Sequence, residues 1–328
     1  MRPVTIAVTG GLGNQLFQFA AAVALADATG REVRLCVRMY DRPILRRAFV
    51  AVRGWARSAL SDADGRFRLG AMRRSVELAA LQRLARACTN AEDAAAGLSR
   101  RSLRALYRDP GARLEGVRVL RSVSEMRAAI EGRAPIPAEE LPLIAGFMQG
   151  DTLAGPAMVR VRRAIEWPDT PYVRRWRAVA RSAPTVGVHV RRGDYLRHAY
   201  RNVFPVLSAE WYRQAAELLV ARHGLLRFLV VTDEPAWARA NLRLPGPVDV
   251  ASGEHPASPQ EDLAVLASCR HHVIANSTFS WWGARLAEPS DQGGDVIAPT
   301  TWHMNGEPLE PGYLPASWMT LENSPTRR

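Results

Sequence analysis

The chain has 328 residues, 47% of them hydrophobic, so it is too long for one ordinary core and too apolar to be disordered. No apolar run is long enough to span a bilayer and the N-terminus lacks a secretory signal, so we expect a cytoplasmic protein. The net charge of +12 lies wholly in residues 31–133, which hold 23 arginines and 11 acidic residues, whereas the rest of the chain is neutral.

The first half of the chain predicts a β-α-β unit followed by a basic helical stretch. A strand at 4–8 leads into a glycine turn, a helix runs over 16–28 with Gly30 as its C-cap, and a second strand covers 32–37. Residues 41–133 are Arg-rich, with a helical pattern and few strands. An apolar stripe is formed by Leu78, Leu81, Leu84 and Ala85, and a break is marked by Pro135, Pro137 and Pro142.

The second half of the chain alternates regularly between strands and helices. Such alternation requires a parallel sheet with helices on both faces, so we expect an α/β fold with domains at 1–170 and 171–328. Helices are predicted at 153–165, 173–182, 211–222, 235–242, 261–268 and 277–287, and strands at 186–190, 228–232, 248–250, 272–275 and 295–298.

The strongest motif is HVRRGDY at 189–195, at the carboxyl end of a hydrophobic strand. Ligands of open α/β sheets bind just beyond such strand ends. Arg191 and Arg192 suit a phosphate clamp, because guanidinium groups hold phosphate oxygens in pairs. The alternative is a solvated loop that happens to carry two arginines.

A second motif, NSTFSWWGARLA at 276–287, again joins a strand to a helix. The hydroxyl groups of Ser277, Thr278 and Ser280 can cap the helix start, whose N–H groups also bind anions, so a pyrophosphate is expected there. The alternative is an ordinary helix cap with the two tryptophans in the core.

The third motif is GGLGNQL at 10–16, which resembles the opening of a dinucleotide-binding turn but lacks its third glycine. The following strand carries Arg34 and Arg38 where an acidic residue would hold the ribose of NAD. An NADP site with arginine on the 2′-phosphate stays open. We prefer a tight turn whose backbone and Asn14 approach a ligand closely.

Acidic and imidazole side chains give weaker signals. Asp233 closes one strand and Asp262 opens a helix, and a carboxylate there can accept hydrogen bonds from guanine. His271 and His272 are adjacent on a strand, face alternate sides and make a poor metal site. We therefore expect a metal-independent reaction in which arginines and helix termini supply the positive charge.

Together the segments GGLGNQLFQ, HVRRGDY and NSTFSWWGARLA, with TDEPAW at 232–237, resemble the alpha-1,2-fucosyltransferases, glycosyltransferase family 11. The resemblance covers residues 4–30 and 184–302, and it does not extend over 41–150. It implies a GT-B-like fold, with two Rossmann-like domains facing a cleft. It also implies GDP-fucose as donor, inversion at the anomeric carbon, no cofactor or metal, and a bacterial enzyme acting on galactose in an O-antigen, a capsule or another glycan.

The resemblance also implies roles for single residues. Arg191 would bind the donor β-phosphate with Arg192 beside it, while His189 and Asp262 would face guanine. The other candidate donor-binding residues are Asp233, Asn276, Ser277, Thr278, Phe279 and Ser280, and those near the sugar are Gly11, Gly13, Asn14 and Gln15. In this interpretation residues 1–170 form the acceptor side and 171–328 bind the donor.

The general base stays open at this stage. Asp194 is the nearest carboxylate to the arginine pair, although it could instead orient Arg192. His198 and Glu210 are weaker candidates, and the leaving phosphate could itself take the proton.

Three other interpretations remain beside this one. An NADP-dependent oxidoreductase would use the opening glycine turn, and a fucosyltransferase of alpha-1,6 linkage would share the donor motifs. A nucleic-acid partner is disfavoured, because the basic stretch has no interleaved aromatic residues. We instead expect the surplus arginines either to be solvated or to contact an anionic membrane surface or a lipid-linked acceptor.

Overall fold

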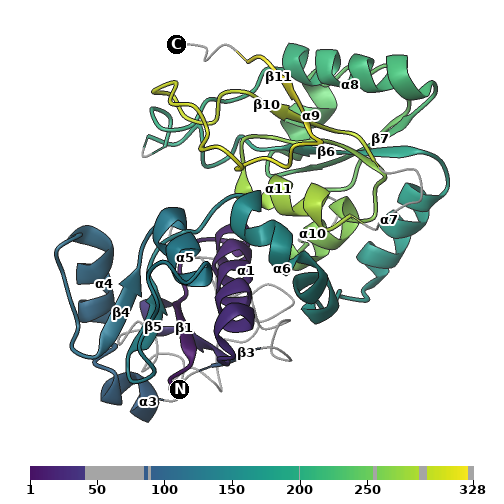
Figure 1. The fold of residues 1–328 in the computed structure, drawn as a ribbon. Coiled ribbons are helices and arrows are strands. Elements are labelled where there is room, and N and C mark those ends of the chain that lie inside the picture. Colours follow the sequence, from purple (N-terminus) through teal and green to yellow (C-terminus); the bar gives the residue numbers. More distant parts are fainter. Residues whose placement is uncertain (41–84, 88–89, 199, 254–256, 288–293, 324–328) are drawn as a thin grey trace, which may run out of the picture. The chain divides into compact units, whose positions relative to one another are not determined.

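The computed structural model describes residues 1–40, 85–87, 90–198, 200–253, 257–287 and 294–323. The chain divides into two compact units, Met1–Glu166 and Trp167–Arg328, each built on its own parallel sheet (Figure 1). Two α/β units of this kind agree with the predicted fold class. Within the described residues, no helix is both long and apolar enough to cross a membrane.

The N-terminal unit is a five-stranded sheet in the order β3-β2-β1-β5-β4. Its strands are β1 (Val4–Ala7), β2 (Val33–Cys36), β3 (Ala85–Ala87), β4 (Val117–Leu120) and β5 (Leu141–Ile144). Its helical elements are α1 (Leu12–Thr29), the short 3-10 helix η1 (Arg38–Tyr40), α3 (Asn90–Ala95), α4 (Arg100–Arg108), α5 (Val123–Ile130) and α6 (Asp151–Ala164).

Helix α1 is the buried centre of this unit. It starts directly after the glycine turn and is rich in alanine, and most of its side chains are buried. It ends where Gly30 takes up a left-handed conformation, with φ of 67°, which glycine adopts without steric cost. The predicted helix and its glycine cap are therefore confirmed.

The described part of the stretch after residue 40 agrees with the helical expectation in α3, α4 and α5, but it also contains the strands β3 and β4. Leu78, Leu81 and Leu84 of the expected apolar stripe lie outside the described residues, and Ala85 begins strand β3. Pro142 lies inside strand β5, so it does not mark the predicted break between secondary-structure elements. The paired register of β5 with β1 starts only at Leu143, so the missing N–H of Pro142 removes no bond of that ladder.

The C-terminal unit is a six-stranded parallel sheet in the order β11-β10-β9-β6-β7-β8. Its strands are β6 (Thr185–Val190), β7 (Arg227–Thr232), β8 (Val248–Val250), β9 (His271–Val273), β10 (Val296–Pro299) and β11 (Met319–Leu321). Its helices are α7 (Pro171–Arg181), α8 (Ala209–His223), α9 (Pro235–Asn241), α10 (Pro259–Leu266) and α11 (Thr278–Arg285).

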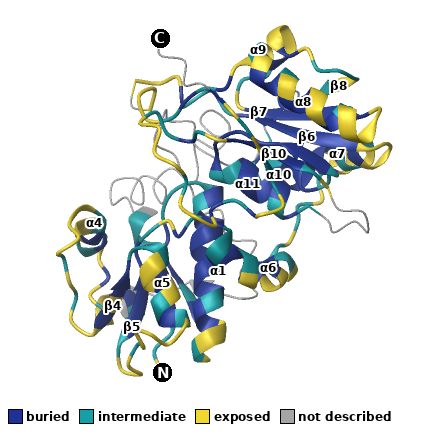
Figure 2. Ribbon diagram, turned by 45° about the horizontal axis from the view of Figure 1, so that its top comes forward, coloured by how far each residue is buried: buried dark blue, intermediate teal, exposed yellow. Residues whose placement is uncertain are grey.

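Helices cover both faces of the C-terminal sheet. One apolar cluster joins the strands to α8 and α9, and another joins them to α7 and α10. Strands β6 and β7 are buried between these layers, whereas α8 exposes its outer side (Figure 2). The predicted alternation of strands and helices is confirmed here, and β11 at the edge is an additional strand.

A candidate anion-binding site at the carboxyl edge of the C-terminal sheet

The order of the strands marks one place on this edge. From β6 the chain proceeds outward through β7 to β8, and it then returns to the other side of β6 to form β9. The two loops that leave β6 and β9 therefore diverge at a topological switch point, where α/β sheets open a crevice for ligands. The motif HVRRGDY spans the end of β6 and the loop after it, and NSTFSWWGARLA spans the loop after β9 and helix α11.

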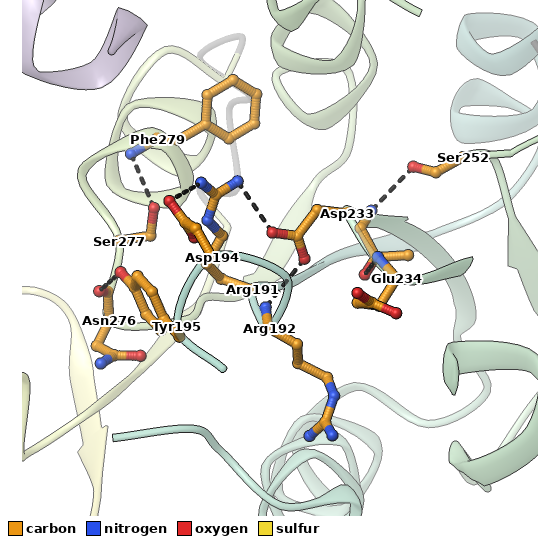
Figure 3. Close-up of polar contacts among 11 residues, drawn as sticks. Arg191, Arg192, Asp194, Tyr195, Asp233, Glu234, Ser252, Asn276, Ser277 and Phe279 are labelled. Carbon is orange, nitrogen blue, oxygen red and sulfur yellow. Dashed lines mark hydrogen bonds and ion pairs between the residues drawn. The ribbon is translucent and has the colours of Figure 1, made fainter. Parts of the chain in front are cut away.

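Arg191 is fixed at the centre of the site by two carboxylates (Figure 3). Its two terminal nitrogens lie 2.7 Å from Asp194 Oδ2 and 3.1 Å from Asp233 Oδ2. Burial disfavours the charged form, but Asp233 and Asp194 outweigh this effect and raise the pKa of Arg191. The guanidinium group is thus permanently charged, held in one orientation and still partly exposed.

Arg192 points away from Arg191 (Figure 3). Its backbone N–H donates to Asp233 Oδ1 at 2.9 Å, and its guanidinium carbon lies 3.8 Å from the ring centre of Trp237. Asp194 pairs with Arg191, so the ion pair described here does not support the alternative in which Asp194 orients Arg192. Successive side chains of an extended backbone point to opposite sides, which separates the two arginines.

The start of α11 supplies the second part of the site. Ser277 is the N-cap of the helix, and its hydroxyl accepts a hydrogen bond from the N–H of Phe279. Thr278 and Phe279 are partly exposed in the first turn. A helix start carries a partial positive charge, so it can attract an anion beside Arg191.

Two neighbouring candidates are directed into the protein instead. The hydroxyl of Ser280 donates to the carbonyl oxygens of Ala275 and Ser277, and its residue is 1% exposed. The amide of Asn276 donates to the carbonyl oxygens of Pro205 and Trp302. Ser280 and Asn276 therefore shape the site from behind.

His189 and Tyr195 line the base of the site. The ring of His189 lies 5.1 Å from that of Phe279, and burial with the nearby charge of Arg191 lowers the pKa of His189 to about 3. His189 is therefore neutral at physiological pH. Tyr195 donates to the carbonyl oxygen of Asn276 at 2.7 Å, which ties the two loops together.

Asp262 lies at the start of α10. Its Oδ1 accepts a hydrogen bond from the hydroxyl of Tyr172 at 2.7 Å. Burial raises the pKa of Asp262 to about 6. The hydrogen bond from Tyr172 lowers this pKa, and the charge of Glu261 raises it. Asp262 therefore changes charge close to neutral pH.

The glycine turn belongs to the N-terminal unit. Gly10 has a φ of 82°, and Asn14 is partly exposed and accepts a hydrogen bond from Gln149. Gln15 is fully buried and donates to the carbonyl oxygen of Gly10, so it supports the turn from inside. Gly11 caps α1 and Gly13 is buried in its first turn.

The arginines that an NADP site would need already have acidic partners. Arg34 pairs with Glu92 and Glu32, and Arg38 lies 2.9 Å from Asp93. Both guanidinium groups are thus engaged by carboxylates of the protein and not directed at a site for a 2′-phosphate. The structure therefore gives the oxidoreductase interpretation no support.

The weaker base candidates lie in different settings. His198 is exposed in the loop after β6, and Glu210 on the surface of α8 pairs with Arg213, whose hydrogen bond lowers its pKa. His271 accepts the N–H of Asp295, and His272 contacts the carbonyl oxygen of Leu266. Among the described residues, no cluster of His, Cys, Asp and Glu side chains is suited to a metal ion.

Two features of the site have no separate signal in the sequence. Asp233 follows a strand, but only the pairing of β6 with β7 shows that its carboxylate reaches Arg191. Trp237, in α9 after the same strand, packs under the guanidinium of Arg192. Both contacts join residues about 40 positions apart, which periodicity cannot detect.

Comparison with known proteins finds relatives for this part of the chain. Residues 175–313 match the model described as Glycosyl transferase family 11. The galactoside alpha-(1,2)-fucosyltransferase 1 of Saimiri sciureus is 38% identical over 125 residues, which are 37% of this chain and 32% of that protein. The galactoside alpha-(1,2)-fucosyltransferase 2 of Sus scrofa is 34% identical over 152 residues, 44% of this chain and 43% of that protein. The chain thus matches less than half the length of these relatives.

Among solved structures, fucosyltransferase NodZ from Bradyrhizobium is 16% identical, with a TM-score of 0.47 over 88% of this chain and 94% of that one. The family match includes the loops after both β6 and β9, which carry Arg191 and the start of α11. Residues 175–313 of this chain are therefore similar to the domain described as Glycosyl transferase family 11, the family that the sequence motifs resemble.

Proposed function

We propose that the chain is an inverting glycosyltransferase that moves L-fucose from GDP-fucose to the 2-hydroxyl of galactose in a glycan acceptor. The observation that carries the proposal is the placement of Arg191. It is a charged guanidinium held by Asp194 and Asp233 at the switch point of the sheet, in the motif HVRRGDY. The galactoside specificity of the matched relatives suggests the acceptor.

The chemistry requires positive charge at one point. Cleavage of the bond between fucose and phosphate leaves a GDP with an additional negative charge and an electron-poor sugar. A guanidinium group has five N–H donors, and the two carboxylates engage one terminal nitrogen each, which leaves donors for a phosphate. Arg191 and the N–H groups at the start of α11 would stabilise that charge as it develops.

We assign the remaining roles on the same basis. Asp194 and Asp233 position Arg191, and His189, Asp262 and Phe279 contact the nucleotide. The carboxylates of Asp194 and Asp233 are both engaged by Arg191, so the leaving phosphate is our choice of acceptor for the proton of the attacking hydroxyl. The proposal needs no metal, and it gives donor binding to the C-terminal unit and part of acceptor binding to Asn14 and the N-terminal unit.

The location of the protein is part of the proposal. We infer a cytoplasmic protein with peripheral contact to an anionic membrane, where a lipid-linked acceptor would be found. Helix α4 supports this, because Arg101, Arg104 and Arg108 are exposed on it and line one hollow together with Arg100.

The decisive experiment measures GDP-fucose turnover with a panel of β-galactosides, followed by NMR analysis of the linkage formed. We expect an alpha-1,2 product, and expect Arg191→Ala to lower turnover by about a hundredfold or more while the protein stays folded. An alpha-1,6 product would show that the protein is a fucosyltransferase of that linkage instead. Full turnover by Arg191→Ala, or thermal stabilisation by NADPH but not by GDP, would refute the proposal.

A further inference from the structure

Two loops beyond the carboxyl edge of the C-terminal sheet are joined into one surface. The loop after β6 contains Pro205, and the loop after β10 contains Trp302. The buried amide of Asn276 donates to the carbonyl oxygens of both residues, at 3.1 Å each. The N–H of Met304 also donates to the carbonyl oxygen of Val203 at 2.9 Å. These bonds fix the two loops against each other.

A row of aromatic rings runs through this surface. Tyr195 lies 5.9 Å from the guanidinium of Arg191 and packs flat on Phe204, with ring centres 4.7 Å apart and planes 18° apart. Phe204 in turn contacts His303 at 5.5 Å and Tyr200 at 6.2 Å. The row therefore begins at the proposed phosphate-binding arginine and ends at Tyr200.

The outer end of the row is apolar and open. Tyr200 is 36% exposed, Val203 is 43% exposed and Leu196 is 46% exposed, whereas Tyr195 at the inner end is only 7% exposed. The exposed polar residues Arg197, Arg201 and Asn202 alternate with them in the same loop. The loop thus offers an aromatic and aliphatic floor with hydrogen-bonding groups around it.

We propose that this surface, the Tyr200 platform, is a subsite for a sugar ring of the acceptor glycan. The inference rests on the proposed function, since it names where the acceptor of that reaction binds. A pyranose ring has an apolar face of C–H groups and a rim of hydroxyls. The axial hydroxyl of galactose leaves the opposite face more apolar still.

Such a ring matches the platform in both respects. Its C–H face can lie on Tyr200 and Phe204, and its hydroxyls can bond to the polar side chains of the loop. Three exposed apolar residues are few for a protein partner, because a stable interface buries about 800 Å² on each side. The continuity of the row with Arg191 places the sugar at the same edge of the sheet as the donor phosphate.

Two variants of Tyr200 and one control test the platform in the full chain. Tyr200→Ala removes the ring, and Tyr200→Phe keeps the ring but not the hydroxyl. The control is Leu225→Ala, since Leu225 is 91% exposed just before β7, at the amino edge of the sheet. Initial rates are measured against a β-galactoside acceptor and against GDP-fucose, and donor hydrolysis is measured without acceptor.

We expect Tyr200→Ala to raise the KM for the acceptor by about three- to tenfold. The KM for GDP-fucose and the rate of donor hydrolysis should not change. Tyr200→Phe and Leu225→Ala should behave as the parent does. An unchanged acceptor KM in a Tyr200→Ala protein that still transfers fucose would overturn the platform and leave the proposed function standing.

A second measurement separates the two ideas if the parent transfers no fucose. Saturation-transfer NMR detects direct binding of a β-galactoside to the parent and to Tyr200→Ala. A signal that is lost only in Tyr200→Ala supports the platform even without activity. The absence of a signal in the parent, or a change of oligomeric state in Tyr200→Ala that points to a protein partner, would overturn it.

Discussion

Arg191 depends on its carboxylate neighbours, and Asp233 is the more informative of the two. Asp233 uses one oxygen for the guanidinium of Arg191 and the other for the backbone N–H of Arg192. It thereby ties the end of β7 to the loop after β6. Removing its charge should release Arg191 while leaving the backbone contact largely in place.

We expect Asp233→Asn to lower kcat/KM by about ten- to a hundredfold, because a misplaced charge stabilises the departing phosphate poorly. Steady-state kinetics with GDP-fucose provide the measurement, and circular dichroism confirms folding. Asp249→Asn is a matched control, since Asp249 pairs with Arg227 at 3.2 Å elsewhere in the same sheet. Equal losses in both variants would show a general effect on folding and contradict the positioning role.

The raised pKa of Asp262 leads us to expect that nucleoside binding depends on pH. Burial raises its pKa to about 6, so the folded protein holds this proton to a higher pH than an unfolded chain does. Its contribution to stability is therefore largest at low pH and is lost as the pH rises towards 6. Only the carboxylate can accept both N–H groups of guanine, so binding should weaken below pH 6.

Guanosine is the appropriate ligand, because it has no phosphate that titrates in this range. Its affinity should fall about tenfold per pH unit below the pKa of Asp262. Calorimetric titration from about one pH unit below to about one unit above that pKa measures it. Asp262→Asn should bind more weakly and show no such slope; a slope that survives the substitution would assign the titration to another group.

At the scale of elements, Arg31 holds together the strand starts of the N-terminal sheet. Its side chain is 8% exposed and donates to the carbonyl oxygens of Arg2, Glu140, Ile136 and Pro137. These carbonyls belong to the segments that precede β1 and β5. One guanidinium therefore supplies hydrogen bonds to four backbone carbonyl groups at the ends of the sheet.

We expect Arg31→Ala to lower the free energy of unfolding by about 3 kcal/mol, because several charge-assisted bonds are lost at a buried position. Chemical denaturation measures the change. Arg118→Ala is the control, because Arg118 bonds to the same residue, Glu140, but through its carboxylate. The Arg118 side chain is 48% exposed, so its removal should lower the free energy of unfolding by less than about 1 kcal/mol. A similar cost for both variants would contradict the role given to Arg31.

The sequence predicts some elements well for a physical reason. The inner strands β6 and β7 are largely apolar because both of their faces are buried, and such runs stand out between helices. The short strands β3 and β4 carry arginine and are surrounded by arginine-rich sequence, so no pattern separates them. Pro142 in β5 gives a misleading signal, because its tolerance depends on where the neighbouring strand begins.

The candidate site was predictable only in part. The two motifs and Arg191 follow from strand ends and residue chemistry. The packing of Arg192 on Trp237, the inward hydrogen bonds of Ser280 and the buried position of Gln15 depend on tertiary contacts. A sequence shows which side chains lie near a site, but not which of them the fold uses for its own support.

At the scale of the whole molecule, charge is divided unevenly along the chain. The surplus of 12 positive charges falls within residues 31–133 of the N-terminal unit, and the rest of the chain is neutral. Basic residues near an anionic membrane contribute about 1 kcal/mol each. The protein should therefore bind such a membrane through its N-terminal unit.

Vesicle flotation tests this membrane contact. We expect the protein to float with vesicles containing phosphatidylserine at low salt, to stay behind at high salt, and to ignore neutral vesicles. A variant with Arg101, Arg104 and Arg108 changed to glutamine should float less, whereas removal of Arg213 and Arg222 from α8 should have little effect. Indifference of the parent to anionic lipid would contradict the membrane proposal.

The strand order of the C-terminal sheet also bears on how such a protein can diverge. Arg191, Asp233 and the cap of α11 stand on three neighbouring inner strands, β6, β7 and β9, so the outermost strands contribute none of them. Lengthening or trimming the chain around β8 or β11 can therefore alter the periphery without displacing the phosphate-facing groups. Natural variants of this domain should accumulate insertions beside the edge strands β8 and β11. Insertions within the inner strands β6, β7 and β9, or in the loops that carry these groups, should be rarer.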